Sequence, residues 1–413
     1  MENNQKYQER LKRVEDAIAV KEPDRIPFIP QAQTFPYVRQ GHTMAQVLYD
    51  IDLALDDNIK YHLDFEPDMG RSVNEVMAGE GPMLEKMGVK FLRWAGQPGV
   101  NIDENSIHQF IEKEYLEEDE YDHILKDYSG WIVNNYLPRS YGLLECLETL
   151  NIPGMVRGKP GPLIRQFKNP KIAEAVSILG DLAKQYITLD AKIAEHDKKL
   201  KELGFPPHVG GGCTTAFDML SDSLRGTLGI MMDVITQPDE VLEAVDQFHE
   251  RNIQLVRKMY GAGLVDGAWF IPMHKGFDGF LSPAQYEKFY YPTLKGLVEE
   301  IVKCGGTPIV YTEGKYDSRM EMLSDLPANK VVINIEDCNM KEAKRILGGN
   351  HCLSGGFKYS ILKSEDPDKI KDEVKKFLDI VAPGGGYIFD IDYTIDDVSD
   401  KAFGALVDAV KAY

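Results

Sequence analysis

The sequence predicts one α/β domain, a (β/α)8 TIM-type barrel with an N-terminal helical extension and insertions. Apolar runs alternate with helical segments through the second half of the chain, which is typical of β–α–β units. These runs are rich in Val, Ile, Tyr and Phe, as expected for buried parallel strands. A doubly wound sheet would carry a glycine-rich turn after its first strand, and residues 25–33 (RIPFIPQAQ) carry none.

Five of the predicted strands are separated by predicted helices. Ser282 is the predicted N-cap of the first of these helices, and Pro283 suits its first position. The predicted strands cover residues 267–274, 307–314, 330–337, 351–357 and 385–392, and the helices cover 282–305, 315–326, 339–349, 366–380 and 397–412.

The first half is less regular. Residues 26–30, 89–94 and 207–211 are the expected earlier strands, and residues 95–206 are expected to hold insertions with two or three helices. We therefore divide the chain into a helical extension, residues 1–24, and a barrel, residues 25–413.

Composition narrows the possible partners. The formal net charge of −19 over 413 residues disfavours nucleic acid and anionic membranes. The sequence contains no run of about 18 apolar residues, so it predicts no membrane-spanning helix. The charged N-terminus lacks the apolar core of a secretory signal. Five cysteines without a CxxC motif suit a reducing compartment, so we expect a cytoplasmic protein.

Catalytic groups of such barrels lie at the carboxyl ends of the strands. His274 ends one predicted strand, and Tyr311 and Glu313 share one face at the end of the next. Converging carboxylates would repel one another unless a cation such as zinc compensates their charge. Strand-end carboxylates can also serve as helix caps, and His274 can be a satisfied pocket histidine. The candidate ligands are Glu313, His274, Asp392, Asp390 and Glu336.

Further residues are candidates for substrate binding. His208 and Cys213 flank a glycine-rich segment (HVGGGCTT) that lacks the GK[ST] ending of a phosphate loop and can equally be a tight turn. Tyr316 and Asp317 follow Glu313 in a loop. Trp269 could line an aromatic substrate or pack in the core.

Three segments resemble the uroporphyrinogen decarboxylase superfamily, which contains decarboxylases and cobalamin-dependent methyltransferases. They are EDAIAVKEPDRIPFIP (15–30), LSPAQYEKFYYPTLKGLVEEI (281–301) and GGYIFDIDYTIDDVS (385–399). The decarboxylases carry an Arg-Gln-Ala-Gly-Arg-Tyr motif after the first strand, where this chain has PQAQTFPYVRQGH with only Arg39. The resemblance therefore favours the methyltransferase branch.

Methyltransferases of this superfamily place a His-X-Cys zinc pair at a strand end, with a later Cys as third ligand. The matching segment IVYTEG puts Tyr311 and Glu313 at that pair, and the last strand offers Asp390, Asp392 and Tyr393. The departure from thiolate ligands resembles methyltransferase I of anaerobic O-demethylases, which acts on veratrol- or vanillate-like substrates.

The resemblance implies methyl transfer from a phenyl methyl ether to cob(I)alamin. No corrinoid-binding Asp-X-His-X-X-Gly signature is present, so the cobalamin is expected on a separate corrinoid protein docked over the barrel mouth. Zinc, or a proton donor such as Tyr311, would assist the leaving oxygen. Three alternatives stay open. The protein could be a methyltransferase with another methyl donor or acceptor, as in methylcobalamin:coenzyme M transfer. It could also be a uroporphyrinogen decarboxylase-like lyase or a metal-dependent hydrolase, or a binding protein without catalytic activity.

Overall fold

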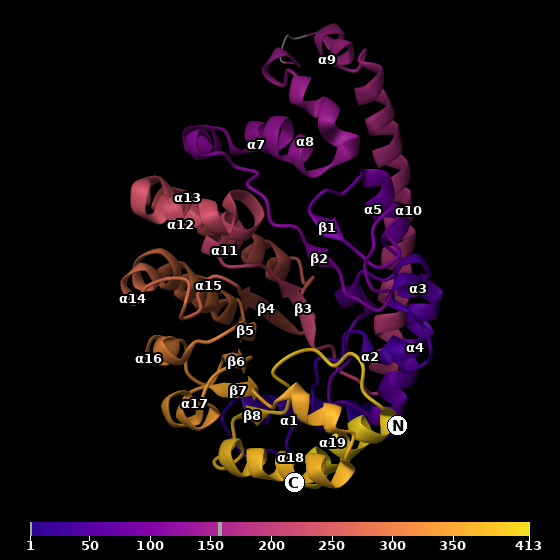
Figure 1. Cartoon of the computed structure of the whole chain (residues 1–413), viewed down its shortest axis with the longest axis vertical. Coiled ribbons are helices and arrows are strands. Elements are labelled where there is room, and N and C mark those ends of the chain that lie inside the picture. Colours follow the sequence, from indigo (N-terminus) through magenta and orange to yellow (C-terminus); the bar gives the residue numbers. More distant parts are fainter. Residues whose placement is uncertain (1, 156–158) are drawn as a thin grey trace.

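The computed structural model describes residues 2–155 and 159–413, with six parallel strands at its centre (Figure 1). Their order in the sheet follows their order in the chain, and helices connect them. All five strands predicted in the second half are confirmed. The strands are β3 (Val209–Gly212), β4 (Ala268–Met273), β5 (Pro308–Thr312), β6 (Val332–Ile335), β7 (Cys352–Gly355) and β8 (Tyr387–Ile388).

Two short extended segments close this sheet into a ring. Phe28 forms a parallel bridge with Phe389, just after β8, and Gly70 forms one with Pro207, just before β3. The two segments are joined by a hydrogen bond of 2.8 Å from the Asp68 backbone N–H to the Phe28 carbonyl. The predicted barrel is therefore confirmed, with these segments in its first and second strand positions.

The prediction of a barrel strand at residues 89–94 is wrong. In that region β1 (Leu92–Arg93) pairs antiparallel with β2 (Gln109–Phe110), apart from the six-stranded sheet. The second barrel position is instead filled around Asp68, whose buried carboxylate binds Arg13 at 2.6 Å and Arg25 at 2.8 Å. A short segment held by ion pairs has no apolar run from which to predict it.

Helices of the second half cover the outside of the sheet (Figure 1). Ser282 accepts a hydrogen bond from the Gln285 backbone N–H, with Pro283 following, so the predicted helix start is confirmed. These helices are α11 (Ala216–Leu220), α12 (Gly226–Thr236), α13 (Pro238–Gly261), α14 (Pro283–Gln285), α15 (Tyr291–Lys303), α16 (Met320–Leu323), α17 (Met340–Leu347), α18 (Pro367–Val381) and α19 (Asp400–Ala412).

The N-terminal helix α1 (Glu2–Ile18) is packed against the barrel interior. Val14 and Ala17 form one buried cluster with Ile309 and Val332, which lie near the starts of β5 and β6. The extension therefore covers the amino-terminal end of the barrel and leaves the carboxyl ends of the strands open.

The insertion before β3 contains α10 (Pro170–Glu202), a helix of 33 residues that projects with α9 (Pro160–Gln166) beyond the rest of the molecule (Figure 1). Among the described residues, no helix is long and apolar enough to cross a membrane. The other helices of the first half are α2 (Phe35–Val38), α3 (Met44–Tyr49), α4 (Ile51–Phe65), α5 (Gly81–Met87), α6 (Tyr121–Lys126), α7 (Tyr128–Trp131), α8 (Leu137–Ser140) and α9 (Pro160–Gln166).

Candidate active site

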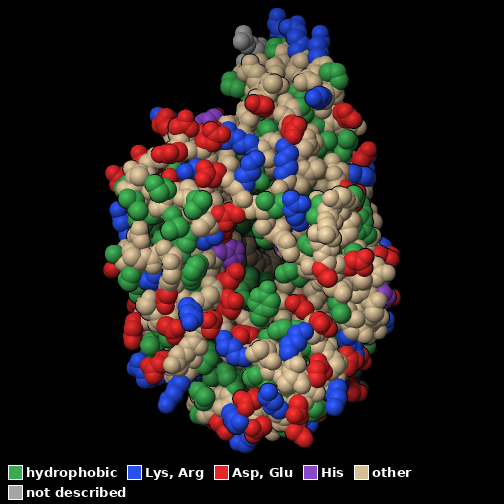
Figure 2. All heavy atoms as spheres, viewed as in Figure 1, with side chains coloured by type: hydrophobic (Ala, Val, Ile, Leu, Met, Phe, Trp, Pro, Cys, Tyr) green, Lys and Arg blue, Asp and Glu red, His purple; other side chains and the backbone are tan. Residues whose placement is uncertain are grey.

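Three predicted site residues follow neighbouring strands at the barrel mouth. Met273 pairs with Thr312, and Thr312 pairs with Ile335, so the residues after them, His274, Glu313 and Glu336, end adjacent strands. Figure 2 shows a hollow in the centre of this face, with histidine and acidic side chains at its edge.

His274 is held between two carboxylates. Its Nδ1 atom lies 2.6 Å from Oδ2 of Asp222, and its Nε2 atom lies 3.5 Å from Oε2 of Glu313. About half of the Glu313 side chain is exposed, whereas Asp222 and His274 are more enclosed. The contact with Asp222 fixes the orientation of the ring and directs Nε2 towards Glu313.

A second aspartate fixes the backbone at the same point. Asp218 is fully buried and accepts hydrogen bonds from the backbone N–H groups of His274 (3.1 Å) and Lys275 (2.9 Å). It also accepts one from the Tyr290 hydroxyl at 2.6 Å. Asp218 and Asp222 are four residues apart, on α11 and the π-helical turn that follows it, so one helical segment supports both the backbone and the ring of His274.

The cluster of charges shifts the protonation of its members. Burial lowers the pKa of His274, but the hydrogen bond to Asp222 and the charges of Asp218, Asp222 and Glu313 outweigh it and raise the pKa to about 9. Burial and the neighbouring Asp222 raise the pKa of Asp218 to about 6. At neutral pH the ring of His274 is therefore positively charged, with Nδ1 facing Asp222 and Nε2 facing Glu313.

Tyr311 lies below Glu313 on the inner face of β5. Its ring is stacked on Phe270 of β4, with ring centroids 5.9 Å apart. Burial, followed by the charges of Glu336 and Glu313, raises the pKa of its hydroxyl, so the phenol stays protonated. Burial also raises the pKa of Glu336, although its carboxylate accepts a hydrogen bond from the Gly314 backbone N–H.

The structure does not bring Asp390 and Asp392 into this group. Asp390 accepts hydrogen bonds from the backbone N–H groups of Gln31 and Ile391, both at 2.8 Å. Asp392 accepts one from the Tyr359 backbone N–H and pairs with Lys358 at 3.3 Å. Among the described residues, no three His, Cys, Asp or Glu side chains are close enough to form a metal site.

Two of the predicted ligands nevertheless have a geometry that suits zinc. Two donors on a tetrahedral zinc, each about 2.0–2.1 Å from it, lie roughly 3.3 Å apart. The Nε2 atom of His274 and the carboxylate of Glu313 are 3.5 Å apart. Ligand histidines also commonly donate their other N–H to a carboxylate, as His274 can to Asp222.

The predicted substrate-binding residues have other environments. Trp269 is 1% exposed and stacks on Tyr260, so it packs in the core between sheet and helices. Tyr316 is buried and donates its hydroxyl proton to the Met273 carbonyl. Asp317 accepts a hydrogen bond from the Asn339 backbone N–H. Cys213 follows β3, where burial raises the pKa of its thiol to about 11.

Sequence reasoning missed Asp218, Asp222 and Arg71. The two aspartates lie in the helical segment that follows the glycine-rich strand β3, so a rule that considers only strand ends does not include them. Arg71 directly follows the second barrel position and binds Glu75 at 2.8 Å. Burial lowers its pKa, but the charges of Glu75 and Asp390 raise it further, so the Arg71 guanidinium stays charged.

Comparisons with known proteins agree with this architecture. Uroporphyrinogen decarboxylases of Pseudomonas syringae and Syntrophotalea carbinolica are 24% and 25% identical over 41% and 42% of this chain. One from Xanthomonas euvesicatoria is 29% identical over 35% of it. The match spans less than half the length of these relatives, 48%, 49% and 43% respectively.

A solved structure, a methyltransferase from Methanosarcina mazei, superimposes with a TM-score of 0.58 at 15% sequence identity. The superposition covers 97% of both chains, so the two proteins share a fold. The family profile described as uroporphyrinogen decarboxylase (URO-D) matches residues 155–413, more than half of the chain. The protein therefore belongs to the uroporphyrinogen decarboxylase (URO-D) family.

Proposed function

We propose that the protein is an enzyme that transfers a methyl group from a phenyl methyl ether to the cob(I)alamin of a separate corrinoid protein. The observation that carries the proposal is the His274–Glu313 pair at the barrel mouth, with Asp222 behind the histidine. The fold shared with a methyltransferase from Methanosarcina mazei supports methyl transfer as the reaction class.

The pair suits the difficult part of this reaction. A phenyl methyl ether resists cleavage because its leaving group is a phenolate, whose conjugate acid has a pKa of about 10. Asp222, Asp218 and Glu313 raise the pKa of His274 to about 9 against the effect of burial, so its imidazolium is nearly matched to the departing oxygen. In this role His274 donates the proton as the methyl group leaves, and Asp222 keeps the ring aligned.

The same two side chains are the best zinc donors in the mouth. If the site holds zinc, Nε2 of His274 and the carboxylate of Glu313 would bind it, and the metal would supply Lewis acidity at the ether oxygen. Glu336 ends the neighbouring strand and is a candidate third ligand. In the first role His274 acts on the leaving oxygen directly, and in the second His274 and Glu313 would act on it through the metal.

The acceptor must reach the mouth from outside, and helix α12 offers a surface for its carrier. Thr227 in the first turn of α12 accepts a hydrogen bond of 2.9 Å from Nζ of Lys275, the residue after His274.

Along α12 an apolar stripe is between 44% and 75% exposed, at the spacing of one helix face. The stripe consists of Leu228, Met231, Met232 and Ile235. Glu112 and Glu114 lie beside it, so we propose that the corrinoid protein docks here with an apolar surface bordered by basic residues.

A decarboxylase acting on a polycarboxylate porphyrinogen suits this mouth less well. Glu313, Glu336 and Asp222 place negative charge where the substrate carboxylates would have to bind. Arg71 is already paired with Glu75.

The test is incubation with reduced cobalamin and a panel of methoxyaromatics, followed by the absorption spectrum of methylcobalamin. We expect methylcobalamin and one phenol per methyl group transferred, and we expect Glu313→Ala to abolish the reaction while the protein stays folded. Unchanged turnover by Glu313→Ala, or release of carbon dioxide from a porphyrinogen instead, would overturn the proposal.

A further inference from the structure

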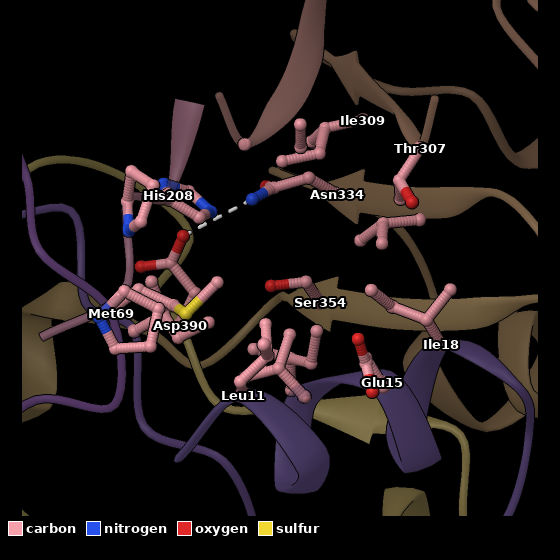
Figure 3. Close-up of a pocket in the computed structure, with 18 of the residues that line it drawn as sticks. Leu11, Glu15, Ile18, Met69, His208, Thr307, Ile309, Asn334, Ser354 and Asp390 are labelled. Carbon is pink, nitrogen blue, oxygen red and sulfur yellow. Dashed lines mark hydrogen bonds between the residues drawn. The ribbon is translucent and has the colours of Figure 1, made fainter. Parts of the chain in front are cut away.

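A second concave site lies at the opposite end of the barrel from the mouth. A cavity of about 250 Å³ extends between α1 and the early residues of β4, β5 and β6 (Figure 3). Barrel interiors of this kind are normally filled by layers of side chains. An unfilled volume lowers stability because the surrounding side chains lose contacts, so a cavity of this size calls for an explanation.

The wall of the cavity is apolar along most of its length. Leu11 and Ile18 come from α1, and Ile309, Val332 and Ile388 come from three strands. At its outer end the lining includes Glu15 and Asp266, which are exposed on the surface. A ligand can therefore enter from the amino-terminal face without passing the mouth.

The inner end is polar and incompletely hydrogen-bonded. Asn334 donates a hydrogen bond of 3.1 Å to Asp390, as Figure 3 shows, and Ser354 presents its hydroxyl beside them. Among the described residues, the Asn334 Oδ1 atom and the His208 Nδ1 atom are buried without a hydrogen-bond partner. Buried polar atoms normally have partners, so these two atoms indicate a missing group at this end.

The surroundings favour a ligand without net charge. Burial lowers the pKa of His208 to about 3, so its ring is neutral and can either donate or accept. Asp390 lies in the lining and accepts hydrogen bonds from two backbone N–H groups, so a ligand anion beside its carboxylate would be disfavoured. The positive charge of Arg71 lowers the pKa of both His208 and Asp390, and the same charge would repel a ligand cation.

The volume sets the size of the ligand. A buried apolar cavity of about 150 Å³ accommodates benzene in another protein, so about 250 Å³ accommodates one ring with small substituents. We infer that this cavity binds a neutral, single-ring molecule that carries a hydroxyl group. The ring packs between α1 and the strands, and the hydroxyl lies at Asn334, His208 and Ser354. This site does not depend on the chemistry proposed for the mouth.

Phenol and cyclohexanol are suitable probes, with benzoate as the charged comparison, and calorimetry measures their affinities for the full chain. Leu11→Trp fills the cavity from a partly exposed position of α1, and Leu63→Trp, at an exposed position of α4, is the matched control. We expect both neutral probes to bind, benzoate to bind at least tenfold more weakly, and Leu11→Trp alone to abolish the binding of cyclohexanol, which, unlike phenol, does not resemble the phenolic product proposed for the mouth.

Two further variants separate this cavity from the mouth. Ser354→Ala should weaken cyclohexanol binding several-fold without unfolding the protein, because it removes one hydroxyl and adds no volume. Glu313→Ala, which alters the mouth, should leave cyclohexanol binding unchanged. If cyclohexanol fails to bind, or binds Leu11→Trp as tightly as the wild type, the cavity holds only water and the inference is wrong.

Discussion

The Nδ1 atom of His274 lies 2.6 Å from the carboxylate of Asp222, and this contact determines which ring nitrogen faces the mouth. The other nitrogen, Nε2, faces Glu313. Because Asp222 lies on the segment after β3 and His274 after β4, the contact also joins two neighbouring βα connections. A carboxylate in this position orients the ring and increases its basicity, whether the ring holds a proton or a metal.

Replacing Asp222 by Asn should therefore lower the turnover number without unfolding the protein. The expected loss is roughly 10- to 100-fold, as for other groups that orient a catalytic histidine. Steady-state methyl transfer to cobalamin measures it, and the pH at which activity falls on the alkaline side should move to lower values. Asp239→Asn, at an exposed position in the first turn of α13, is the control. A parallel loss in both variants would mean that Asp222 has no special role.

Metal analysis tests the zinc proposal separately from activity. If His274 and Glu313 hold zinc, the purified wild type should contain about one equivalent, and His274→Ala should lose it. Asp392→Asn should retain the metal, because Asp392 pairs with Lys358 away from the pair. Wild-type protein that stays active after exhaustive chelation would leave protonation by His274 as the remaining role for the pair.

The sequence predicted the later strands well because each is a short apolar run between two amphipathic helices. It also predicted His274 and Glu313, because residues at the ends of adjacent parallel strands meet at one edge. The sequence could not predict how far below the barrel mouth the Asp390 side chain lies. Alternation along a strand gives the face of a side chain, but the hydrogen bond from Gln31, on the neighbouring first segment, depends on how the ring closes.

The aspartates behind His274 were harder to find for a different reason. Asp218 is buried and accepts hydrogen bonds from backbone N–H groups just after β4, which lie 56 and 57 positions away in the sequence. No local spacing records such a contact. The short segment in the second barrel position was equally hard to predict, because ion pairs from Asp68 to Arg13 and Arg25 hold it in place.

Two adjacent tyrosines test the contribution of Asp218 to stability. Tyr290 donates to the buried Asp218 carboxylate at 2.6 Å, and Tyr291 donates to the neutral Met322 carbonyl at 2.6 Å. Tyr290→Phe should lower the free energy of unfolding by about 1.5–3 kcal/mol, and Tyr291→Phe by about 0.5–1.5 kcal/mol. Urea denaturation measures both values. Equal losses would show that the Asp218 carboxylate does not strengthen its bond.

His62 should make the protein sensitive to acid. Its Nδ1–H donates to the Asn58 carbonyl, and its Nε2 accepts from the Arg71 backbone N–H, so the buried ring is neutral. Burial lowers its pKa from 6.5 to about 3. The unfolded chain therefore binds a proton that the folded chain does not, and stability falls as the pH decreases from 6.5 towards 3.

This residue alone should contribute a slope of about 1.4 kcal/mol per pH unit in that interval. His62→Gln, which cannot take up a proton, should have a smaller slope than the wild type when unfolding is measured between pH 7 and pH 4. His123→Gln, at an exposed position of α6, should keep the wild-type slope. A wild-type slope in His62→Gln would show that the acid sensitivity arises elsewhere.

The apolar stripe of α12 should control reaction with the corrinoid protein but not with free cobalamin. Leu228 is 75% exposed and Ile235 is 71% exposed, so replacing either by Glu should change the folded structure little. At the interface a buried carboxylate without a partner is costly, and the neighbouring Glu112 adds repulsion. We expect Leu228→Glu to raise the KM for the corrinoid protein at least tenfold with kcat for free cobalamin unchanged. Leu264→Glu, at a position that is 60% exposed and lies beyond α13, is the matched control. If Leu228→Glu and Leu264→Glu have the same KM for the corrinoid protein, the carrier docks on another part of the rim.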